Sequence, residues 1–145
     1  MKVVIMQGAS GSGKSTYIKD KHSDAVICSA DHFFMEDGEY KFDPELLGAA
    51  HKACMYKFIQ ACQSGESVVV VDNTNTTRVE MAPYVSVAAA FGAEVEIVRC
   101  EASAEECADR NTHGVPAGAC EAMVKRIQDP MPFWDVTLTK ISTGV

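Results

Sequence analysis

Gly8-Ala9-Ser10-Gly11-Ser12-Gly13-Lys14-Ser15-Thr16 is the stretch that decides the fold. An apolar run at residues 3–6 precedes it, and a segment compatible with a helix begins near Lys14. Glycines allow consecutive backbone N–H groups to turn inward around phosphate oxygens, and the following helix presents its positive end to the same anion. In such a loop the lysine contacts the β and γ phosphates and the next hydroxyl ligates Mg²⁺. The stretch, residues 8–16, therefore predicts a phosphate-binding P-loop. Such a loop is a nucleoside triphosphate site, with Lys14 and Ser15 in these two roles.

Length, charge and composition limit the class of protein. The chain has 145 residues, 47% of them hydrophobic, and a formal net charge of −7. This length predicts one domain over residues 1–145, and no uninterrupted apolar run is long enough to predict a membrane span. The first strand leaves no room ahead of it for a secretory signal, so we expect a cytoplasmic protein. The negative charge disfavours nonspecific coating of nucleic acid, but a nucleic acid end can still enter a small basic cleft.

The six cysteines form no C-x-x-C pair and fall mostly within apolar periodic segments. We expect buried, reduced thiols, and neither a metal site nor disulfides. They are Cys28, Cys54, Cys62, Cys100, Cys107 and Cys120.

Apolar runs alternate with helical patterns along the whole chain. Strands are predicted at residues 3–6, 25–28, 68–71, 95–98 and 136–141. Helices are predicted after the P-loop, over about twenty residues from Asp43-Pro44, from Thr77 to 91 despite Pro83, and within 104–128. This alternation predicts a three-layer α/β domain, with about five mainly parallel strands and helices on both faces.

Two aspartates follow predicted parallel strands at the edge where ligands bind in such sheets. Asp72 follows four valines and can hold Mg²⁺ through water or orient Ser15, or it can cap the next loop. Asp31 lies where a phosphate acceptor would approach and can take the proton of an acceptor hydroxyl, or it can be a turn residue. Asn73, and not a glutamate, follows Asp72, and no Asn-Lys-x-Asp motif occurs. Both absences favour a kinase over an ATPase motor or a GTPase.

A cationic helix–loop–helix is predicted late in the chain, at about residues 104–128. Arg110 and Arg126 are its candidates for stabilising charge on a transferring phosphoryl group, although surface arginines are common on amphipathic helices. We expect His113, in its loop, to be a hydrogen-bonding residue, and no spacing of histidines predicts zinc. Aromatic residues near Asp31 can stack on a base or pack over the sheet edge; they are Phe33, Phe34, Tyr40 and Phe42.

Five motifs together resemble the small P-loop kinases of the polynucleotide 5′-hydroxyl kinase group. They are the P-loop, the stretch from Ser29 to Phe34, the stretch from Gly38 to Pro44, Asp72-Asn73-Thr74-Asn75, and the stretch from Arg110 to Pro116. The resemblance covers about residues 3–128 and extends to phage enzymes and to kinase domains of some ubiquitin-ligase-binding proteins. It implies ATP and Mg²⁺ as cofactors, Asp31 as the base, and a lid carrying Arg110 and Arg126.

One position departs from the pattern of phage-type enzymes, which place an arginine three residues after the catalytic aspartate to hold the acceptor phosphate. Here that residue is Phe34. Arg78 can replace the missing cation, or the acceptor can bind by stacking. The substrate-binding residues that we predict are Phe34, Asp43, Asn73, Asn75 and Arg78.

The leading hypothesis is an ATP-dependent kinase that phosphorylates a hydroxyl of a nucleic acid, at a 5′ end or on a hydroxymethylated base. The second hypothesis is a kinase for a free small molecule or nucleoside. A third, from a different class, is a nucleotide-dependent switch or binding module without transfer activity. The presence of both Asp31 and Asp72 disfavours this third hypothesis, because a switch needs no acceptor base.

Overall fold

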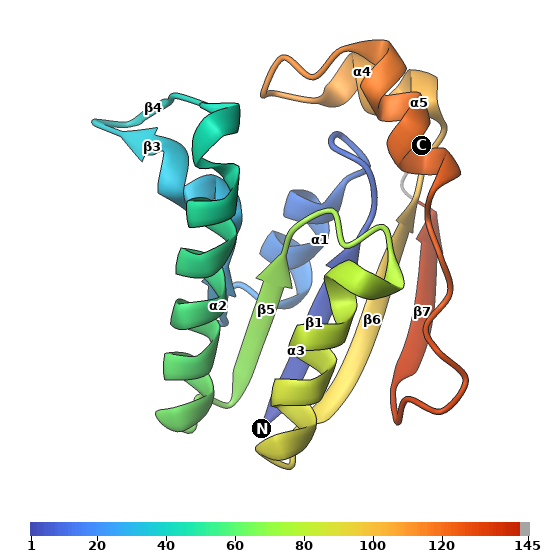
Figure 1. Cartoon of the computed structure of the whole chain (residues 1–145). Helices are drawn as coiled ribbons and strands as arrows, with labels where there is room; N and C mark the ends of the chain where they lie inside the picture. The colour runs from blue at the N-terminus through green and yellow to red at the C-terminus, as the bar shows by residue number, and fades with distance from the viewer. Residues whose placement is uncertain (143–145) are drawn as a thin grey trace.

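The fold is built on one parallel sheet. The structure is a computed structural model and describes residues 1–142. Its five strands are β1 (Lys2–Gln7), β2 (Val26–Cys28), β5 (Val68–Asp72), β6 (Glu94–Glu101) and β7 (Thr137–Ser142). They lie in the order β2-β5-β1-β6-β7, and every neighbouring pair is parallel (Figure 1). All five strands coincide with the predicted apolar runs, which confirms the predicted sheet.

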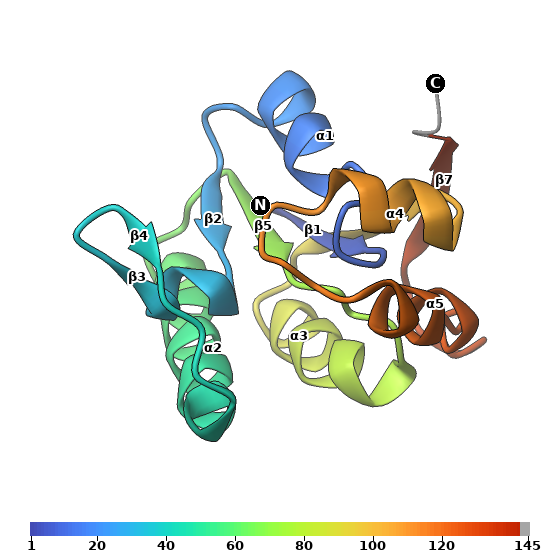
Figure 2. The same ribbon diagram turned by 90° about the horizontal axis from the view of Figure 1, so that it is seen from above.

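Helices cover both faces of the sheet, so the predicted three layers are present. Helix α1 (Lys14–Lys21) lies on one face, and α2 (Leu47–Gln63) and α3 (Arg78–Ala90) lie on the other (Figure 2). Alternate side chains of β1 separate the two cores, because neighbouring residues of a strand point to opposite faces. Val3 and Ile5 join the core under α2 and α3, whereas Val4 and Met6 join the core under α1.

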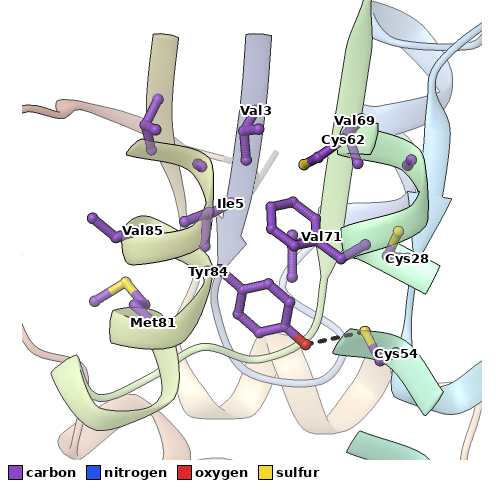
Figure 3. Close-up of a cluster of buried hydrophobic side chains, with 14 of the residues drawn as sticks. Val3, Ile5, Cys28, Cys54, Cys62, Val69, Val71, Met81, Tyr84 and Val85 are labelled. Atoms are coloured by element: carbon purple, nitrogen blue, oxygen red, sulfur yellow. Dashed lines mark hydrogen bonds between the residues drawn. The ribbon is translucent and has the colours of Figure 1, made fainter. Parts of the chain in front are cut away.

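The larger core holds the two helices of one face against the sheet (Figure 3). Phe58 of α2 and Tyr84 of α3 meet edge to face, with ring centroids 5.1 Å apart. The buried Tyr84 hydroxyl donates a hydrogen bond to Cys54 Sγ at 3.2 Å, which satisfies the polar end of an otherwise apolar side chain. All six cysteines are buried and unpaired with one another, as expected for reduced thiols.

Side-chain caps fix where the helices begin. Thr77 accepts a hydrogen bond from the Glu80 backbone N–H and starts α3 at Arg78, so Pro83 lies inside a regular helix. Pro83 is the sixth residue of α3 and has no N–H to donate to the Val79 carbonyl oxygen, so the helix lacks one intrahelical hydrogen bond there, but the proline does not delay the start of the helix. The second predicted helix begins differently, because Asp43 caps a 3₁₀ turn, Pro44–Leu46, and the α-helix follows at Leu47.

The predicted helix–loop–helix is also present. It consists of α4 (Ala104–Arg110), which Ser103 and Glu106 start with a reciprocal capping box, and α5 (Ala117–Lys125). Helix α5 ends before Ile127, two residues earlier than its apolar pattern predicts. Cys107 and Cys120 of the two helices pack on Ala9, so the helix pair lies directly against the P-loop.

Two short elements connect β2 to α2. A 3₁₀ helix, Ala30–Phe34, is followed by a hairpin of β3 (Met35–Glu36) and β4 (Glu39–Tyr40). Both stand at the carboxyl edge of the sheet, on the side of α2 (Figure 1). Within residues 1–142 no helix is long and apolar enough to cross a membrane.

Candidate active site

The P-loop joins β1 to α1 in a conformation that its glycines permit. Gly11 and Gly13 have φ angles of 82° and 100°, in the left-handed region that side chains disfavour. A Cβ on Gly11 would overlap the carbonyl oxygen of Cys107, so α4 and the P-loop approach as closely as backbones can. The backbone N–H of Gly8 donates to the Thr74 carbonyl oxygen at 2.9 Å, which ties the loop to the segment after β5.

Lys14 and Asp72 form the charged centre of this loop. Lys14 Nζ donates to the carbonyl oxygens of Gly8 and Ala9, each at 2.9 Å. Burial lowers the pKa of the Lys14 ammonium, and the negative charge of Asp72 opposes that shift. Burial likewise raises the pKa of the Asp72 carboxyl, against the effect of Lys14. A desolvated cation and a desolvated carboxylate side by side are suited to a ligand that brings both phosphate oxygens and a divalent ion.

A cavity of about 400 Å³ surrounds this centre, and we call it the P-loop cavity. Its walls come from the P-loop, the ends of β2 and β5, and the loop after α4. It is lined by Ser10, Gly11, Gly13, Lys14, Ser15, Thr16, Asp31, Asp72, Asn73, Thr74, Arg110, Asn111, Thr112 and His113. Hydroxyl and carboxylate oxygens suit Mg²⁺, so Ser15 and Asp72 fit the predicted ion. No cluster of three or more His, Cys, Asp or Glu side chains that could hold a metal occurs in residues 1–142.

Asp31 is held from three directions. Ser29 caps the 3₁₀ helix by accepting a hydrogen bond from the Asp31 backbone N–H, and Asn73 Oδ1 accepts one from Ala30 N at 2.9 Å. The Tyr40 hydroxyl donates to Asp31 Oδ1 at 3.1 Å. On the other side, His113 Nε2 lies 3.6 Å from Asp31 Oδ2. The carboxyl is still half exposed, so one oxygen is fixed while the group stays open to a ligand.

A second, larger cavity of about 870 Å³ lies over α2 and α3, and we call it the apolar cavity. Its lining comes from the 3₁₀ helix, β4, α2, α3, the loop after β5, the loop before α5, and α5 itself. The lining residues are Ser10, Ala30, Asp31, Tyr40, Phe42, Leu47, Gly48, His51, Lys52, Met55, Asn73, Thr74, Asn75, Val79, Glu80, Pro83, Tyr84, His113, Gly114, Val115, Pro116, Met123 and Arg126.

The two cavities meet at Asp31. Five residues line both of them, and Asp31 is the acid among these five: Ser10, Asp31, Asn73, Thr74 and His113. Asp31 therefore lies between the cavity at the P-loop, of about 400 Å³, and the larger apolar cavity, of about 870 Å³.

The two predicted arginines lie in different cavities. Arg110 lines the P-loop cavity, where its Nε donates to the Glu106 carbonyl oxygen and its guanidinium lies 3.9 Å from the Glu106 carboxylate. Arg126 lines the apolar cavity, and its Nε donates to Thr76 Oγ1 at 3.2 Å. From the sequence we predicted that both arginines contact the transferring phosphoryl group. Of the two, Arg110 is the one that lines the P-loop cavity.

Three residues that we predicted to bind the acceptor lie outside both cavities. Phe34 is 4% exposed and packs in the larger core, because the 3₁₀ helix turns it inward. Asp43 caps the turn before α2 by accepting from Glu45 N. Arg78 Nε donates to the Asp129 carbonyl oxygen at 2.8 Å.

Asn73 and Asn75 lie at the predicted place but serve the backbone. Asn73 holds the 3₁₀ helix, as described above, and Asn75 Nδ2 donates to the Met6 carbonyl oxygen at 2.8 Å. Asn75 has a φ of 46°, a conformation that asparagine tolerates better than most residues. Both fix the loop after β5, which forms part of both cavity walls.

Sequence reasoning missed two features of this region. Tyr40 and His113 lie with their rings 4.0 Å apart beside Asp31, although 73 residues of chain separate them and no local pattern joins them. Gln7 Oε1 accepts from Arg99 Nε at 2.8 Å, and Arg99 pairs with Asp129 at 2.8 Å. Polar residues at the end of a buried strand, such as Gln7 and Arg99, are the signal that could have revealed this network.

Comparison with known proteins places the chain in a family. The AAA domain family (AAA_33) matches residues 3–128. NEDD4-binding protein 2 of Homo sapiens is 32% identical over 133 residues, which cover 87% of this chain. The chain spans 8% of the length of that human protein.

Solved structures share the fold at lower identity. A candidate kinase of Chloroflexus aurantiacus J-10-fl aligns with a TM-score of 0.71 and 18% identity over 99% of this chain and 88% of that one. A chain of the Pnkp1/Rnl/Hen1 RNA repair complex aligns with a TM-score of 0.71 and 22% identity, over 88% of this chain and 44% of that one. A gluconokinase of Sinorhizobium meliloti 1021 aligns with a TM-score of 0.59 and 17% identity, over 97% of this chain and 82% of that one. The chain belongs to the AAA domain family and shares its α/β fold with these solved kinase structures.

Proposed function

We propose that the protein is an ATP-dependent kinase that transfers the γ-phosphate to a hydroxyl of a nucleic acid, at a 5′ end or on a hydroxymethylated base. The observation that carries this proposal is the position of Asp31, which lines both the P-loop cavity and the apolar cavity. A kinase needs a carboxylate at the point where donor and acceptor meet. A nucleotide switch needs only the first cavity.

The donor half follows from the P-loop. The backbone N–H groups from residue 8 to residue 16 and the start of α1 would surround the triphosphate, with Lys14 on its β and γ oxygens. Ser15 and Asp72 would hold Mg²⁺, directly or through water, and the ion would neutralise phosphate charge. Lys14 and Asp72 are already desolvated in this cavity, so they need little reorganisation to meet these charges.

The chemical step is an in-line displacement at the γ phosphorus. The acceptor oxygen bonds to phosphorus as the bond to the β–γ bridging oxygen breaks, ADP leaves, and the hydroxyl proton passes to Asp31. Tyr40 occupies Oδ1 of Asp31, which leaves Oδ2 to the acceptor or to His113. Arg110, in the P-loop cavity, stabilises the charge that develops on the transferring group.

We further propose that residues 104–128 act as a lid within a single kinase domain, residues 1–145. In Figure 1 helices α4 and α5 lie above the loop that joins β1 to α1; Arg110 is the last residue of α4, and Arg126 directly follows α5. Closure of such an element excludes water from the transfer and commits the substrate.

Support for a nucleic acid acceptor comes from the resemblance to polynucleotide kinases and from aromatic residues. Tyr40 and Phe42 stack at 6.3 Å beside Asp31 and line the apolar cavity, as a base-stacking platform would. One neighbour in fold is part of an RNA repair complex, which is consistent with this choice.

A free small molecule is the second candidate for the acceptor. Its support is the size of the apolar cavity, which lies in the range of sites that surround a whole small ligand, together with the net charge of −7. A gluconokinase shares the fold as well.

A transfer screen with radiolabelled ATP and Mg²⁺ tests the proposal. Its acceptors are 5′-hydroxyl DNA and RNA, DNA containing hydroxymethyluracil, nucleosides and pools of small metabolites. We expect label in a nucleic acid fraction, and none with Lys14→Ala. Label only in small metabolites would establish the second candidate. ATP binding without transfer to any acceptor would overturn both and leave a nucleotide-binding module.

A further inference from the structure

The apolar cavity is lined by two basic side chains that come from different parts of the chain. Lys52 comes from α2, and Arg126 directly follows α5. In Figure 2 these two helices lie on either side of α3, and residues from the first half of α3 also line the cavity. The lining of this cavity therefore includes the Asp31 carboxyl and the two basic side chains.

Arg126 is fixed in place without a carboxylate partner. Its Nε donates to Thr76 Oγ1, and Thr76 Oγ1 in turn donates to Glu80 Oε1 at 3.0 Å. Glu80 Oε2 accepts from the Thr76 backbone N–H at 3.2 Å, so both oxygens of the nearest acid are already bound. Within residues 1–142 no carboxylate lies within ion-pair distance of Arg126, whereas Arg99 and Arg110 each have one.

The surroundings of Arg126 allow an anion to bind its guanidinium. Most side chains lining this cavity are apolar, among them Leu47, Met55, Val79, Pro83 and Met123. Arg126 lines this cavity and is exposed to solvent, so an anion can reach its guanidinium directly, and a charge-assisted hydrogen bond to it is stronger than one between neutral groups. A guanidinium whose Nε is already held presents its remaining N–H groups to such an anion in a fixed orientation.

We propose that Arg126 is a specificity-determining residue that binds an anionic group of the acceptor, with Lys52 as the second cation of this subsite. The acceptor is then an alcohol with three parts: a hydroxyl at Asp31, an apolar or planar body over α2 and α3, and a phosphate or carboxylate at Arg126. This inference rests on the proposed function, and it assigns Arg126 to the acceptor and not to the transferring phosphoryl group. The anion can be an internal phosphate of a nucleic acid or the single phosphate of a small molecule.

A pair of matched probes tests the subsite apart from catalysis. Thymidine 3′-monophosphate and 3′-O-methylthymidine both carry a free 5′-hydroxyl and the same base, but only the first carries an anion. Calorimetric titration of the MgADP-bound protein gives the affinity for each. We expect the wild-type protein to prefer the monophosphate by about 10- to 100-fold, the range for hydrogen bonds to charged groups.

Arg126→Ala should abolish this preference and leave the affinity for 3′-O-methylthymidine unchanged. Lys125→Ala is the matched control, because Lys125 carries the same charge one residue earlier, is 73% exposed, and pairs with Glu121 at 2.9 Å outside the cavity. The control should keep the wild-type preference. Equal loss in both variants would show a diffuse charge effect and would overturn the subsite.

Transfer assays with a 5′-hydroxyl oligothymidylate beside the monophosphate separate the two sources of the anion. An Arg126→Ala defect for both acceptors supports a phosphate subsite, and a much larger defect for one identifies the source. Equal wild-type affinity for the two probes, including no binding of either, would overturn the inference even if transfer occurs. Discrimination by Arg126 without any transfer would support the subsite and overturn the proposed function instead.

Discussion

The P-loop cavity and the apolar cavity differ in how the chain encodes them. Six of the fourteen residues that line the first come from one continuous stretch, residues 10–16, and the others are Asp31, residues 72–74 and residues 110–113. The second draws its lining from residues between 10 and 126, on segments spread along most of the chain. Its function therefore depends on how the helices pack, and a substitution there changes the ligand more easily than the reaction. The donor chemistry is thus a property of a motif, and the acceptor choice is a property of the fold.

Replacement of Lys14 by alanine should have the largest effect on the donor side. The ammonium is the buried cation of the P-loop cavity, so its loss removes charge stabilisation at the phosphates. We expect phosphoryl transfer to fall by about 10²–10³, the range for a preorganised electrostatic contact. The melting temperature should not fall, because burial of this charge is unfavourable to folding. Transfer at the wild-type rate would remove the P-loop assignment.

Arg110 and Arg126 test whether the two cavities act separately. Arg110→Ala should lower kcat by about tenfold or more and change the KM for the acceptor little, as expected for a contact that strengthens in the transition state. Arg126→Ala should mainly raise the KM of an anionic acceptor. Steady-state kinetics with both substrates varied distinguishes them. The same change in kcat and KM in both variants would contradict the assignment of the two arginines to separate functions.

Tyr40 probes the point where the cavities meet. Tyr40→Phe removes the hydroxyl that donates to Asp31 and keeps the ring that contacts His113. We expect transfer to slow by about 3- to 10-fold, the usual value of one hydrogen bond, with unchanged ATP affinity. Burial and the neighbouring Asp31 charge raise the pKa of Tyr40 to about 12, so the hydroxyl stays a donor and this ratio should be constant across neutral pH. Tyr56→Phe, at an exposed site on α2, is the control and should have no effect.

The smallest expected effect is on stability. Burial raises the pKa of Asp72 in the folded state, so its ionised form is disfavoured there even beside Lys14. The penalty is absent below the unfolded pKa of about 3.9 and reaches its full size as pH rises through the folded value. Asp72→Asn should therefore stabilise the protein at neutral pH by about 0.5–2 kcal/mol while impairing Mg²⁺-dependent transfer. Denaturant titrations at neutral and acidic pH check this, and a gain that persists at acidic pH would contradict the charge explanation.

The sequence predicted the parts of the molecule whose signals are local. Four-residue apolar runs located β1, β2 and β5, spaced apolar residues located β6 and β7, and the capping pair Ser103 and Glu106 located α4. Phe34 shows the limit, because a 3₁₀ helix turned into the core a residue that linear spacing placed beside the acceptor. Arg126 shows the same limit, because the packing of α5, and not spacing along the chain, decides which cavity this residue lines. The contact of Tyr40 with His113 had no local signal at all, because it depends on how the hairpin and the lid loop meet.

Asp31→Asn tests the central claim that a carboxylate at the junction of the two cavities accepts the acceptor proton. Asparagine keeps the shape and can still accept from Tyr40, but it cannot take a proton. ATP affinity is measured by calorimetry in the presence of Mg²⁺, and transfer is measured in a single turnover on the acceptor found in the screen. The account predicts nearly unchanged ATP affinity and a fall in transfer of about 10²–10⁴, the range for a lost general base. Transfer at the wild-type rate would show that Asp31 is a turn residue, and loss of ATP binding would place it in the metal site; either result would contradict the account.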